Sequence, residues 1–473
     1  MAFSSRFSAF SFVFFTTLLS FFVISSQQPV LDLPEQESVY QVLDTVNPTI
    51  PWRSLFPDDI CSSAPHGVVC DYFIEPTTNG TVTFQAETVH ITELSFGNVS
   101  DSSPNPPCTP NSTLSPLLFT SFKYLRKLFF YKCFTVTRVS VPENVPASFG
   151  SSLEELVFIE NPSLVGSLGG IIGNFTNLRR LVLTGNGFYG TIPDKVGRLV
   201  GLEEVTLSRN KLSGGVSLSF AKLKKLKILD LSQNYFDGNV PEELGNLTQL
   251  LKLDLSNNGF YGKIPESFGF LQSLEFLDLS FNRFGSFGVP LFLGQMSSLR
   301  EVYLSGNSLK GQIPEIWENL GSVLGIGFSG MGLVGTIPSS MGLHLKKLCY
   351  LGLDNNNLEG SVPEEFGVLE SVSEINLENN NLSGRVPFSA KFTSKVGGKL
   401  KLKGNPDLCI DERVSTGKQA NDSLRQLKLC RAPDIPNAVL FNGASSSSSS
   451  SSSRPFLSSL VLSFVGVLIV LAG

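Results

Sequence analysis

Apolar positions in this chain follow a short pattern that returns about every 24 residues between residues 153 and 387. Residues 178–193 read LRRLVLTGNGFYGTIP, and residues 226–241 read LKILDLSQNYFDGNVP. Alternating apolar positions over a few residues predict a short β-strand with one buried face. The asparagine, glycine and proline that follow are turn-forming residues. Each unit therefore predicts one strand, one turn and a return segment.

A marker asparagine follows each expected strand, and only the position of Met331 breaks the series. An amide side chain can satisfy backbone donors and acceptors that a turn leaves open. One unit is too small to close a core, whereas stacked units bury a continuous apolar column. The pattern is that of a leucine-rich repeat, so we expect an α/β-type repeat solenoid, a superhelix with a parallel β-sheet on its concave face. The asparagines are Asn161, Asn186, Asn210, Asn234, Asn258, Asn282, Asn307, Asn356 and Asn380.

The first 26 residues have the composition of a secretory signal peptide. One arginine precedes an apolar run from Phe10 to Ile24, and small residues follow. A membrane-spanning segment is the weaker alternative, because the run is short and polar sequence follows it. The expected remaining parts are an N-terminal cap at 27–85, about eleven repeats at 86–388 with the first irregular, and a C-terminal cap at 389–431.

The last residues resemble a signal for attachment of a GPI lipid anchor. Asn442, Gly443 and Ala444 precede nine serines and an apolar stretch that ends at Gly473. We expect a linker at 432–442, lipid attachment at Asn442 and removal of residues 443–473. A transmembrane helix is the alternative, but its flanking Arg454 would lie on the wrong side for the positive-inside rule.

The seven cysteines indicate disulfide-stapled caps, because a solenoid exposes its apolar column at both ends. Connectivity does not follow from sequence alone. Proximity favours three pairs and leaves Cys349 over, either as a partly buried thiol or as half of an intermolecular bridge. The expected pairs are Cys61 with Cys70 in the N-terminal cap, Cys108 with Cys133 across an early insertion, and Cys409 with Cys430 in the C-terminal cap.

Composition argues against several other classes of function. A net charge of −5 gives no reason to expect nucleic acid as a partner. The three histidines are far apart, and we find neither metal-ligand spacing nor a kinase signature, P-loop or nucleophile elbow. We therefore expect no enzymatic activity, cofactor or metal. Seven glycosylation sequons agree with secretion: Asn79, Asn98, Asn111, Asn174, Asn246, Asn381 and Asn421.

Three irregular parts of the chain are more specific than the repeats: residues 94–108, residues 128–133 with 149–153, and the end from 386 to 409. The Gly-x-Ile-Pro step of the repeats is typical of plant leucine-rich repeats. Together with the three irregular parts, it makes residues 55–430 resemble plant leucine-rich-repeat receptor-like proteins of the TOO MANY MOUTHS-like group. That group includes Piriformospora-insensitive-type relatives. The resemblance implies a co-receptor without a kinase at the plasma membrane, joined to a receptor kinase and shaping recognition of secreted peptides in development or defence. The vacant position at Met331 and the serine tract depart from that group.

Side chains beside the buried strand positions would face the concave surface, where solenoids bind partners. Exposed aromatic residues there suggest interface anchors. The column of Asp230, Asp254 and Asp278 could attract a basic ligand. However, Leu-Asp-Leu-Ser is also a common sequence in this type of repeat. The glycines of residues 325–330 would either admit a partner backbone or mark a tolerated weak unit. The candidate ligand-binding residues are Phe276, Phe281, Arg300, Tyr303 and Tyr350.

The sequence therefore predicts a glycosylated, membrane-anchored receptor-like protein on the extracellular face of the plasma membrane. It would bind a secreted peptide or protein and act through a receptor kinase, since its sequence carries no output domain. Sharing one membrane raises the effective concentration of such partners. An extracellular inhibitor of microbial wall-degrading enzymes is the alternative, which would not need the C-terminal signal. A purely structural wall protein agrees less well with the irregular segments.

Overall fold

The computed structural model describes residues 29–62, 67–79, 82–98, 105–143, 145–146, 150–170, 172, 174–411 and 422–430. They belong to one compact unit that ends at Cys430. The expected signal peptide, Asn421, the attachment site Asn442 and the C-terminal signal lie outside the described residues. No helix in the described part of the chain has the length and hydrophobicity needed to cross a membrane.

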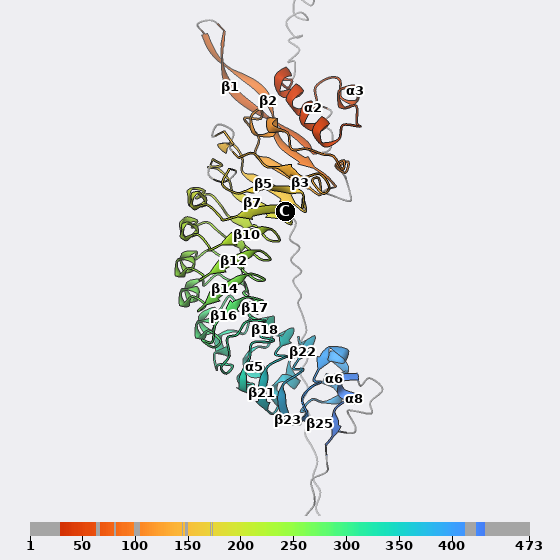
Figure 1. Cartoon of the computed structure of the whole chain (residues 1–473), viewed down its shortest axis with the longest axis vertical. Coiled ribbons are helices and arrows are strands. Elements are labelled where there is room, and N and C mark those ends of the chain that lie inside the picture. Colours follow the sequence, from red (N-terminus) through yellow and green to blue (C-terminus); the bar gives the residue numbers. More distant parts are fainter. Residues whose placement is uncertain are drawn as a thin grey trace, which may run out of the picture. The chain divides into compact units, whose positions relative to one another are not determined.

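The N-terminal cap combines two helices with a hairpin (Figure 1). Helix α2 (Leu33–Val46) buries Val39, Val42, Leu43 and Val46, which recur at helical spacing on one face. Helix α3 (Trp52–Leu55) follows, and strands β1 (Val68–Asn79) and β2 (Val82–Phe96) pair antiparallel. The Cys61–Cys70 disulfide ties the loop after α3 to β1.

The repeats stack their strands into one long sheet, which lies on the inner side of the curved stack in Figure 1. After β2 every strand of this sheet pairs in parallel with its neighbour, because each repeat returns the chain to the same edge. In order they are β3 (Lys127–Tyr131), β5 (Glu155–Ile159), β7 (Arg180–Thr184), β9 (Glu204–Thr206), β11 (Ile228–Asp230), β13 (Lys252–Asp254), β15 (Phe276–Asp278), β17 (Glu301–Tyr303), β18 (Gly325–Gly327), β20 (Tyr350–Gly352), β22 (Glu374–Asn376) and β24 (Leu400–Lys401).

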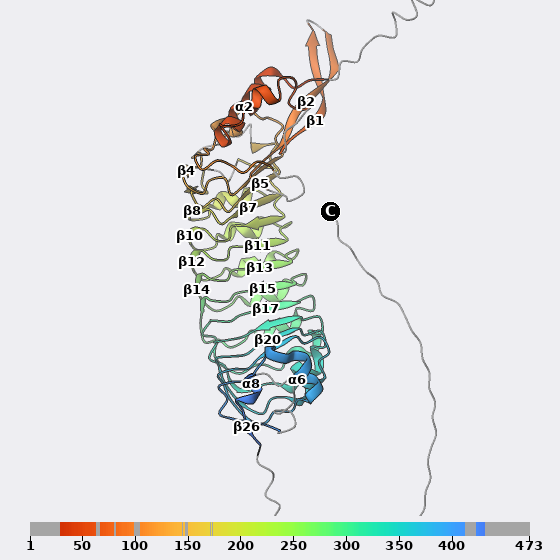
Figure 2. The same ribbon diagram turned by 90° about the vertical axis from the view of Figure 1, so that its right-hand side faces the viewer.

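Short strands after the marker asparagines build two further sheets, and Figure 2 shows β8 to β14 along one flank of the stack. The first comprises β4 (Val139–Ser140), β6 (Leu164–Ser167), β8 (Gly187–Gly190), β10 (Lys211–Gly214), β12 (Tyr235–Gly238), β14 (Gly259–Gly262) and β16 (Arg283–Phe284). The second comprises β19 (Val334–Thr336), β21 (Asn357–Gly360), β23 (Asn381–Arg385), β25 (Asp407–Ile410) and β26 (Lys428–Leu429).

Single helical turns complete the repeats on the side away from the long sheet. Half of those given below begin directly after a proline, which lies at the N-cap with its φ fixed by the ring. The 3-10 turns are η1 (Pro116–Phe119), η2 (Asp194–Arg198), η3 (Leu218–Lys222), η4 (Glu242–Asn246), η5 (Glu266–Phe270), η6 (Leu291–Gln295), η7 (Trp317–Asn319), η8 (Glu364–Val368) and η9 (Gly397–Lys399), and the short α-helices are α5 (Ser339–His344), α6 (Ala390–Val396) and α8 (Asp422–Arg425).

The marker asparagines join neighbouring repeats. The amide nitrogen of Asn234 donates to the carbonyls of Leu207 in the preceding repeat and Leu231 in its own, at 2.9 and 3.1 Å. Its oxygen accepts the backbone N–H of Leu212 at 3.1 Å. The same three bonds recur at Asn258, Asn282, Asn356, Asn380 and Asn405. This ladder satisfies buried backbone groups between strands and turns, as the sequence predicted.

The residue before each marker position has a left-handed backbone. Gln233 and Asn257 have φ of 52° and 54°, and Gly185, Gly306 and Gly330 occupy the same place with φ of 70°, 72° and 63°. Non-glycine residues rarely adopt this conformation. The asparagine ladder therefore stabilises this turn, since the intrinsic backbone preference of the non-glycine residues would not.

Two more disulfides are present where the sequence suggested them. Cys108 pairs with Cys133 beside the first irregular repeat, and Cys409 of β25 pairs with Cys430 next to β26. In the C-terminal cap, Phe392 and Val396 of α6 are buried. Apolar side chains and a covalent link thus close the end of the core.

Candidate functional site

Strand register places the candidate aromatic residues side by side on the long sheet. Phe276 pairs with Lys252 on one side and Glu301 on the other, whereas Tyr303 pairs with Asp278 and with Gly327. Tyr350 pairs with Gly325. Buried apolar residues alternate with these positions, so the aromatic side chains leave the sheet on the face opposite the core.

Three of the rings form a connected group, here named the aromatic patch: Phe276, Tyr303 and Tyr350. The ring centroids of Phe276 and Tyr303 are 5.9 Å apart, and those of Tyr303 and Tyr350 are 6.4 Å apart. Both distances suit tilted aromatic pairs. All three side chains are partly exposed. The structure therefore gathers residues from β15, β17 and β20 into one aromatic surface.

Glycines of β18 and β20 form the floor under the two tyrosines. A Cβ atom added at Gly327 would lie 2.6 Å from Tyr303 Cδ1, and one added at Gly325 would lie 2.8 Å from Tyr303 Oη. At Gly352 a Cβ would lie 2.5 Å from Tyr350 Oη. The idea that the β18 glycines admit a partner backbone is wrong, because β18 is buried beneath the Tyr303 ring.

Hydrogen bonding and burial fix Tyr303 in its neutral form. Its hydroxyl donates to Glu301 Oε2 at 2.8 Å. Partial burial, followed by this bond to the carboxylate, raises the pKa of Tyr303 well above the usual tyrosine value. Burial likewise raises the pKa of Tyr350. The patch therefore presents neutral rings, one of them held in place by a charge-assisted bond.

A lysine supplies positive charge at one end of the patch. Lys252 Nζ lies 5.4 Å from the centroid of Phe276, 2.8 Å from Asp230 Oδ2 and 3.7 Å from Asp254 Oδ2. Despite opposition from burial, these carboxylates raise the pKa of Lys252. The ammonium is thus shared between an aromatic face and two acids.

The aspartate column has a structural role. Oδ1 of Asp230 accepts the backbone N–H and hydroxyl of Ser232 at 3.1 and 2.7 Å, and Asp254 accepts the same two groups of Ser256 at 3.1 and 2.8 Å. Both aspartates are buried. Burial, followed by repulsion from Asp230, raises the pKa of Asp254 to about 6. These acids close the turns after their strands and are poorly placed to meet a ligand.

Phe281 and Arg300 lie near the patch without joining the ring contacts. Phe281 is 59% exposed, has a left-handed φ of 55° and covers Gly306. Arg300 is paired with Glu275 through a 3.0 Å contact. Phe281 follows β15 and Arg300 precedes β17, so the two residues border the patch at opposite ends of its strands.

A surface of paired charges lies on the earlier repeats, apart from the aromatic patch. Arg180 binds Glu155 and Glu204 at 2.9 Å each, while Glu203 binds Arg179 and Lys227 at 2.8 Å each. These residues line a hollow of about 220 Å³. Hydrogen bonds from Lys227 and then Arg179 lower the pKa of Glu203 to about 2. The network was missed from sequence, although charges of alternating sign at the repeat spacing could have revealed it.

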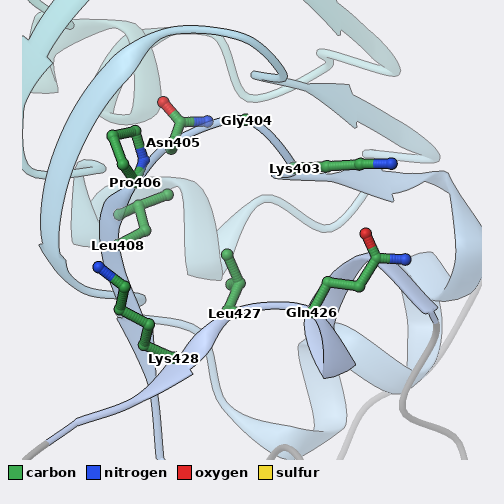
Figure 3. Close-up of a pocket in the computed structure, with 8 residues that line it drawn as sticks. All are labelled: Lys403, Gly404, Asn405, Pro406, Leu408, Gln426, Leu427 and Lys428. Atoms are coloured by element: carbon green, nitrogen blue, oxygen red, sulfur yellow. The ribbon is translucent and has the colours of Figure 1, made fainter.

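The C-terminal cap holds a larger hollow of about 410 Å³ (Figure 3). Leu408 and Leu427 contribute apolar surface, and the lysines Lys403 and Lys428 lie toward different sides of it. Its lining includes no carboxylate, histidine, serine or cysteine. The charged side chains of this lining are the two lysines.

Cys349 and the possible metal ligands are the remaining candidates for chemistry in the described part of the chain. Cys349 is unpaired and partly buried, and its Sγ lies 3.4 Å from the carbonyl of Lys347. Among the described residues, no group of histidines, cysteines and carboxylates could hold a metal ion.

The repeats match family models described as leucine rich repeat at residues 176–236 and 200–260, and again at 273–296, 298–320 and 347–369. The parallel sheet built from these residues decides the fold. The chain has the leucine-rich-repeat fold. Parts of the chain are similar to three Arabidopsis thaliana proteins, one of them named Receptor like protein 29, which confirms the resemblance inferred from the sequence.

Two Arabidopsis thaliana relatives show how far the likeness of this leucine-rich-repeat protein extends. Piriformospora indica-insensitive protein 2 is 36% identical over 167 residues, which cover 35% of this chain and 36% of that protein. Protein TOO MANY MOUTHS is 33% identical over 148 residues, which cover 31% of this chain and 26% of that protein. The matched segments thus span about a third or less of these relatives.

A solved receptor ectodomain is similar in structure. It is the leucine-rich-repeat ectodomain of the Arabidopsis thaliana receptor kinase GASSHO1/SCHENGEN3, in complex with CASPARIAN STRIP INTEGRITY FACTOR 2. The likeness has a TM-score of 0.52 and 29% identity, covering 64% of this chain and 38% of that one.

Five sequon asparagines have described side chains, and all five are exposed: Asn98, Asn111, Asn174, Asn246 and Asn381. Asn246 ends η4 and Asn381 begins β23, so both lie away from the long sheet. Glycans at these two positions would leave the aromatic patch uncovered.

Proposed function

We propose that this leucine-rich-repeat protein is a cell-surface receptor-like protein that binds a secreted peptide or protein on its aromatic patch. The observation that carries the proposal is the connected, partly exposed group of Phe276, Tyr303 and Tyr350 on the inner sheet. Rigid aromatic side chains supply much contact area at low entropic cost, so they commonly dominate interfaces. The GASSHO1/SCHENGEN3 ectodomain of similar fold, solved in complex with CASPARIAN STRIP INTEGRITY FACTOR 2, supports ligand binding by a repeat stack of this kind.

We further propose that the protein acts as a co-receptor beside a receptor kinase. In this proposal a receptor kinase in the same membrane reports the bound ligand. Attachment through a lipid at Asn442 would hold both partners in one membrane and raise their effective concentration. Phospholipase C specific for phosphatidylinositol should release the full chain from intact plant membranes. Protein already free in the medium would favour the enzyme-inhibitor alternative.

Site-specific photocrosslinking tests the binding surface. A photoreactive phenylalanine analogue replaces Tyr303 in the full chain, expressed at the plant cell surface. A matched variant carries the analogue at Tyr235, which is 67% exposed on the flank strand β12. We expect a peptide or protein adduct from position 303 and none of the same mass from position 235. Equal adducts from both positions, or none from position 303, would contradict the proposal.

A further inference from the structure

Three carboxylates border the aromatic patch without a cationic partner. Asp278 and Glu301 lie on β15 and β17, and Asp354 follows β20. Asp278 also pairs in register with Tyr303. All three acids are partly exposed. In the described part of the chain, the ion pairs on these strands involve other acids, so the negative charge of these three is not compensated.

The acids of the earlier repeats, in contrast, are paired. Glu155 and Glu204 both bind Arg180, and Glu203 binds Arg179 and Lys227. These contacts compensate the carboxylates on β5 and β9. The unpaired negative charge beside the aromatic patch is therefore not a general property of the long sheet.

The unpaired acids are close enough to act on the tyrosine rings. After burial and the bond to Glu301, the charge of Asp278 contributes to raising the pKa of Tyr303. At Tyr350, the charge of Asp354 adds to the effect of burial in raising the pKa. The face of an aromatic ring itself carries partial negative charge. Rings and carboxylates together therefore favour a positive charge at this surface.

One end of the patch already binds a cation of the protein itself. Lys252 Nζ lies 5.4 Å from the centroid of the Phe276 ring and 2.8 Å from Asp230 Oδ2, so it contacts a ring and a carboxylate together. Tyr303 and Tyr350 have the same combination of rings and acids nearby. No lysine or arginine of the described residues lies over either tyrosine ring. A ligand can supply the cation there.

We propose that the aromatic patch recognises a cationic peptide segment, with an arginine side chain placed on its two tyrosines. A guanidinium plane stacks on aromatic rings while its N–H groups bind carboxylates. Glu301 Oε2 accepts the hydroxyl of Tyr303 at 2.8 Å, and Oε1 accepts no hydrogen bond from the described residues. This carboxylate therefore has an oxygen available for the arginine. The inference rests on the proposed function, because it names the class of ligand bound at the same surface.

Pools of short peptides test this class of ligand. Each hexapeptide pool has blocked ends and one fixed residue, either arginine or its neutral isostere citrulline, and the other positions vary among uncharged residues. The full chain is immobilised, and the retained peptides are quantified by mass spectrometry. Because a hydrogen bond to a charged group is stronger than one to a neutral group, we expect at least about 10-fold greater retention of the arginine pool. Equal retention of the two pools would overturn the inference.

Two matched double variants locate the preference for arginine. Glu301→Gln/Asp354→Asn removes two charges beside the patch and keeps an oxygen acceptor at both positions. Glu243→Gln/Glu318→Gln removes the same charge from exposed positions on η4 and η7. The first variant should lose the preference by at least about 5-fold, and the second should keep it. An equal preference in both variants would contradict the inference, since net charge rather than the patch would then attract arginine.

The Phe276→Ala/Tyr303→Ala variant separates this inference from the proposed function. If this variant retains both pools as well as wild type does, the patch is not the binding surface, and the proposed function fails together with the inference. If it loses both pools while wild type shows no preference for arginine, the patch binds peptides and only the cationic class of ligand is wrong.

Discussion

The ammonium of Lys252 lies 5.4 Å from the centre of the Phe276 ring while it pairs with Asp230 at 2.8 Å. One side chain thus links the acids of β11 and β13 to the first ring of the aromatic patch. It compensates two buried carboxylates and restrains the edge of the proposed binding surface. Its removal should affect both stability and binding.

Lys252→Met tests this link. The methionine keeps most of the apolar stem but leaves Asp230 and Asp254 without their cation. Breaking a fully buried ion pair costs about 3–5 kcal/mol and breaking an exposed one under about 1 kcal/mol, so this pair, whose lysine is 35% exposed, should cost about 1–3 kcal/mol. Chemical denaturation should show that loss. Lys211→Met, on exposed strand β10, is the control and should change stability by less than about 0.5 kcal/mol.

Gly327→Ala should displace Tyr303. The new methyl group would lie 2.6 Å from Tyr303 Cδ1, so the ring must shift or the sheet must distort. We expect a loss of about 1–3 kcal/mol in stability and a changed near-ultraviolet tyrosine signal. Gly215→Ala is the matched control, because its methyl group would meet only the Asp237 carbonyl, at 3.9 Å. Identical behaviour of the two variants would exclude the close packing of Tyr303 on β18.

Asn282→Ala should destabilise the stack. The substitution removes bonds to the carbonyls of Leu255 and Leu279 and from the N–H of Phe260, at 2.9, 3.0 and 3.1 Å. Each buried backbone group left unpaired costs about 1–3 kcal/mol, so a loss of roughly 2–5 kcal/mol is expected. Thermal unfolding measures it. Asn239→Ala should cost much less, because Asn239 is exposed and has an ordinary backbone conformation. Comparable losses would mean that the ladder contributes little.

Asp254 makes stability depend on pH. Its folded pKa is about 6, raised from an ordinary value of 3.8, so the folded protein holds this proton more tightly. The tighter proton binding stabilises the folded state in full below pH 3.8, and this stabilisation is lost as pH rises through 6. Asp254→Asn removes it and still offers an oxygen to Ser256. The stability of the variant relative to wild type should therefore rise by about 1–3 kcal/mol between pH 4 and 7. A constant difference across that range would contradict the raised pKa.

The repeats and their core follow directly from the sequence, because a leucine that recurs at one place in every unit can only face inward. Disulfide pairs were suggested by proximity along the chain. The floor of the patch was not predictable, since glycines at 325 and 327 look like open backbone until the Tyr303 ring is placed over them. The structural role of Asp230 was not predictable either. Its carboxylate accepts a hydrogen bond from Ser232, two residues away, and the two side chains meet only because the chain turns between them.

The central claim is that the aromatic patch binds a secreted ligand, and quantitative capture tests it most directly. The full chain, its Phe276→Ala/Tyr303→Ala variant and a Tyr235→Ala/Tyr261→Ala flank variant are displayed at equal density on plant cells. Each is incubated with the same extracellular peptide fraction, and bound species are quantified by mass spectrometry. We predict a species that wild type and the flank variant retain equally and that the patch variant loses by at least about 10-fold. Equal retention by all three proteins would contradict the account.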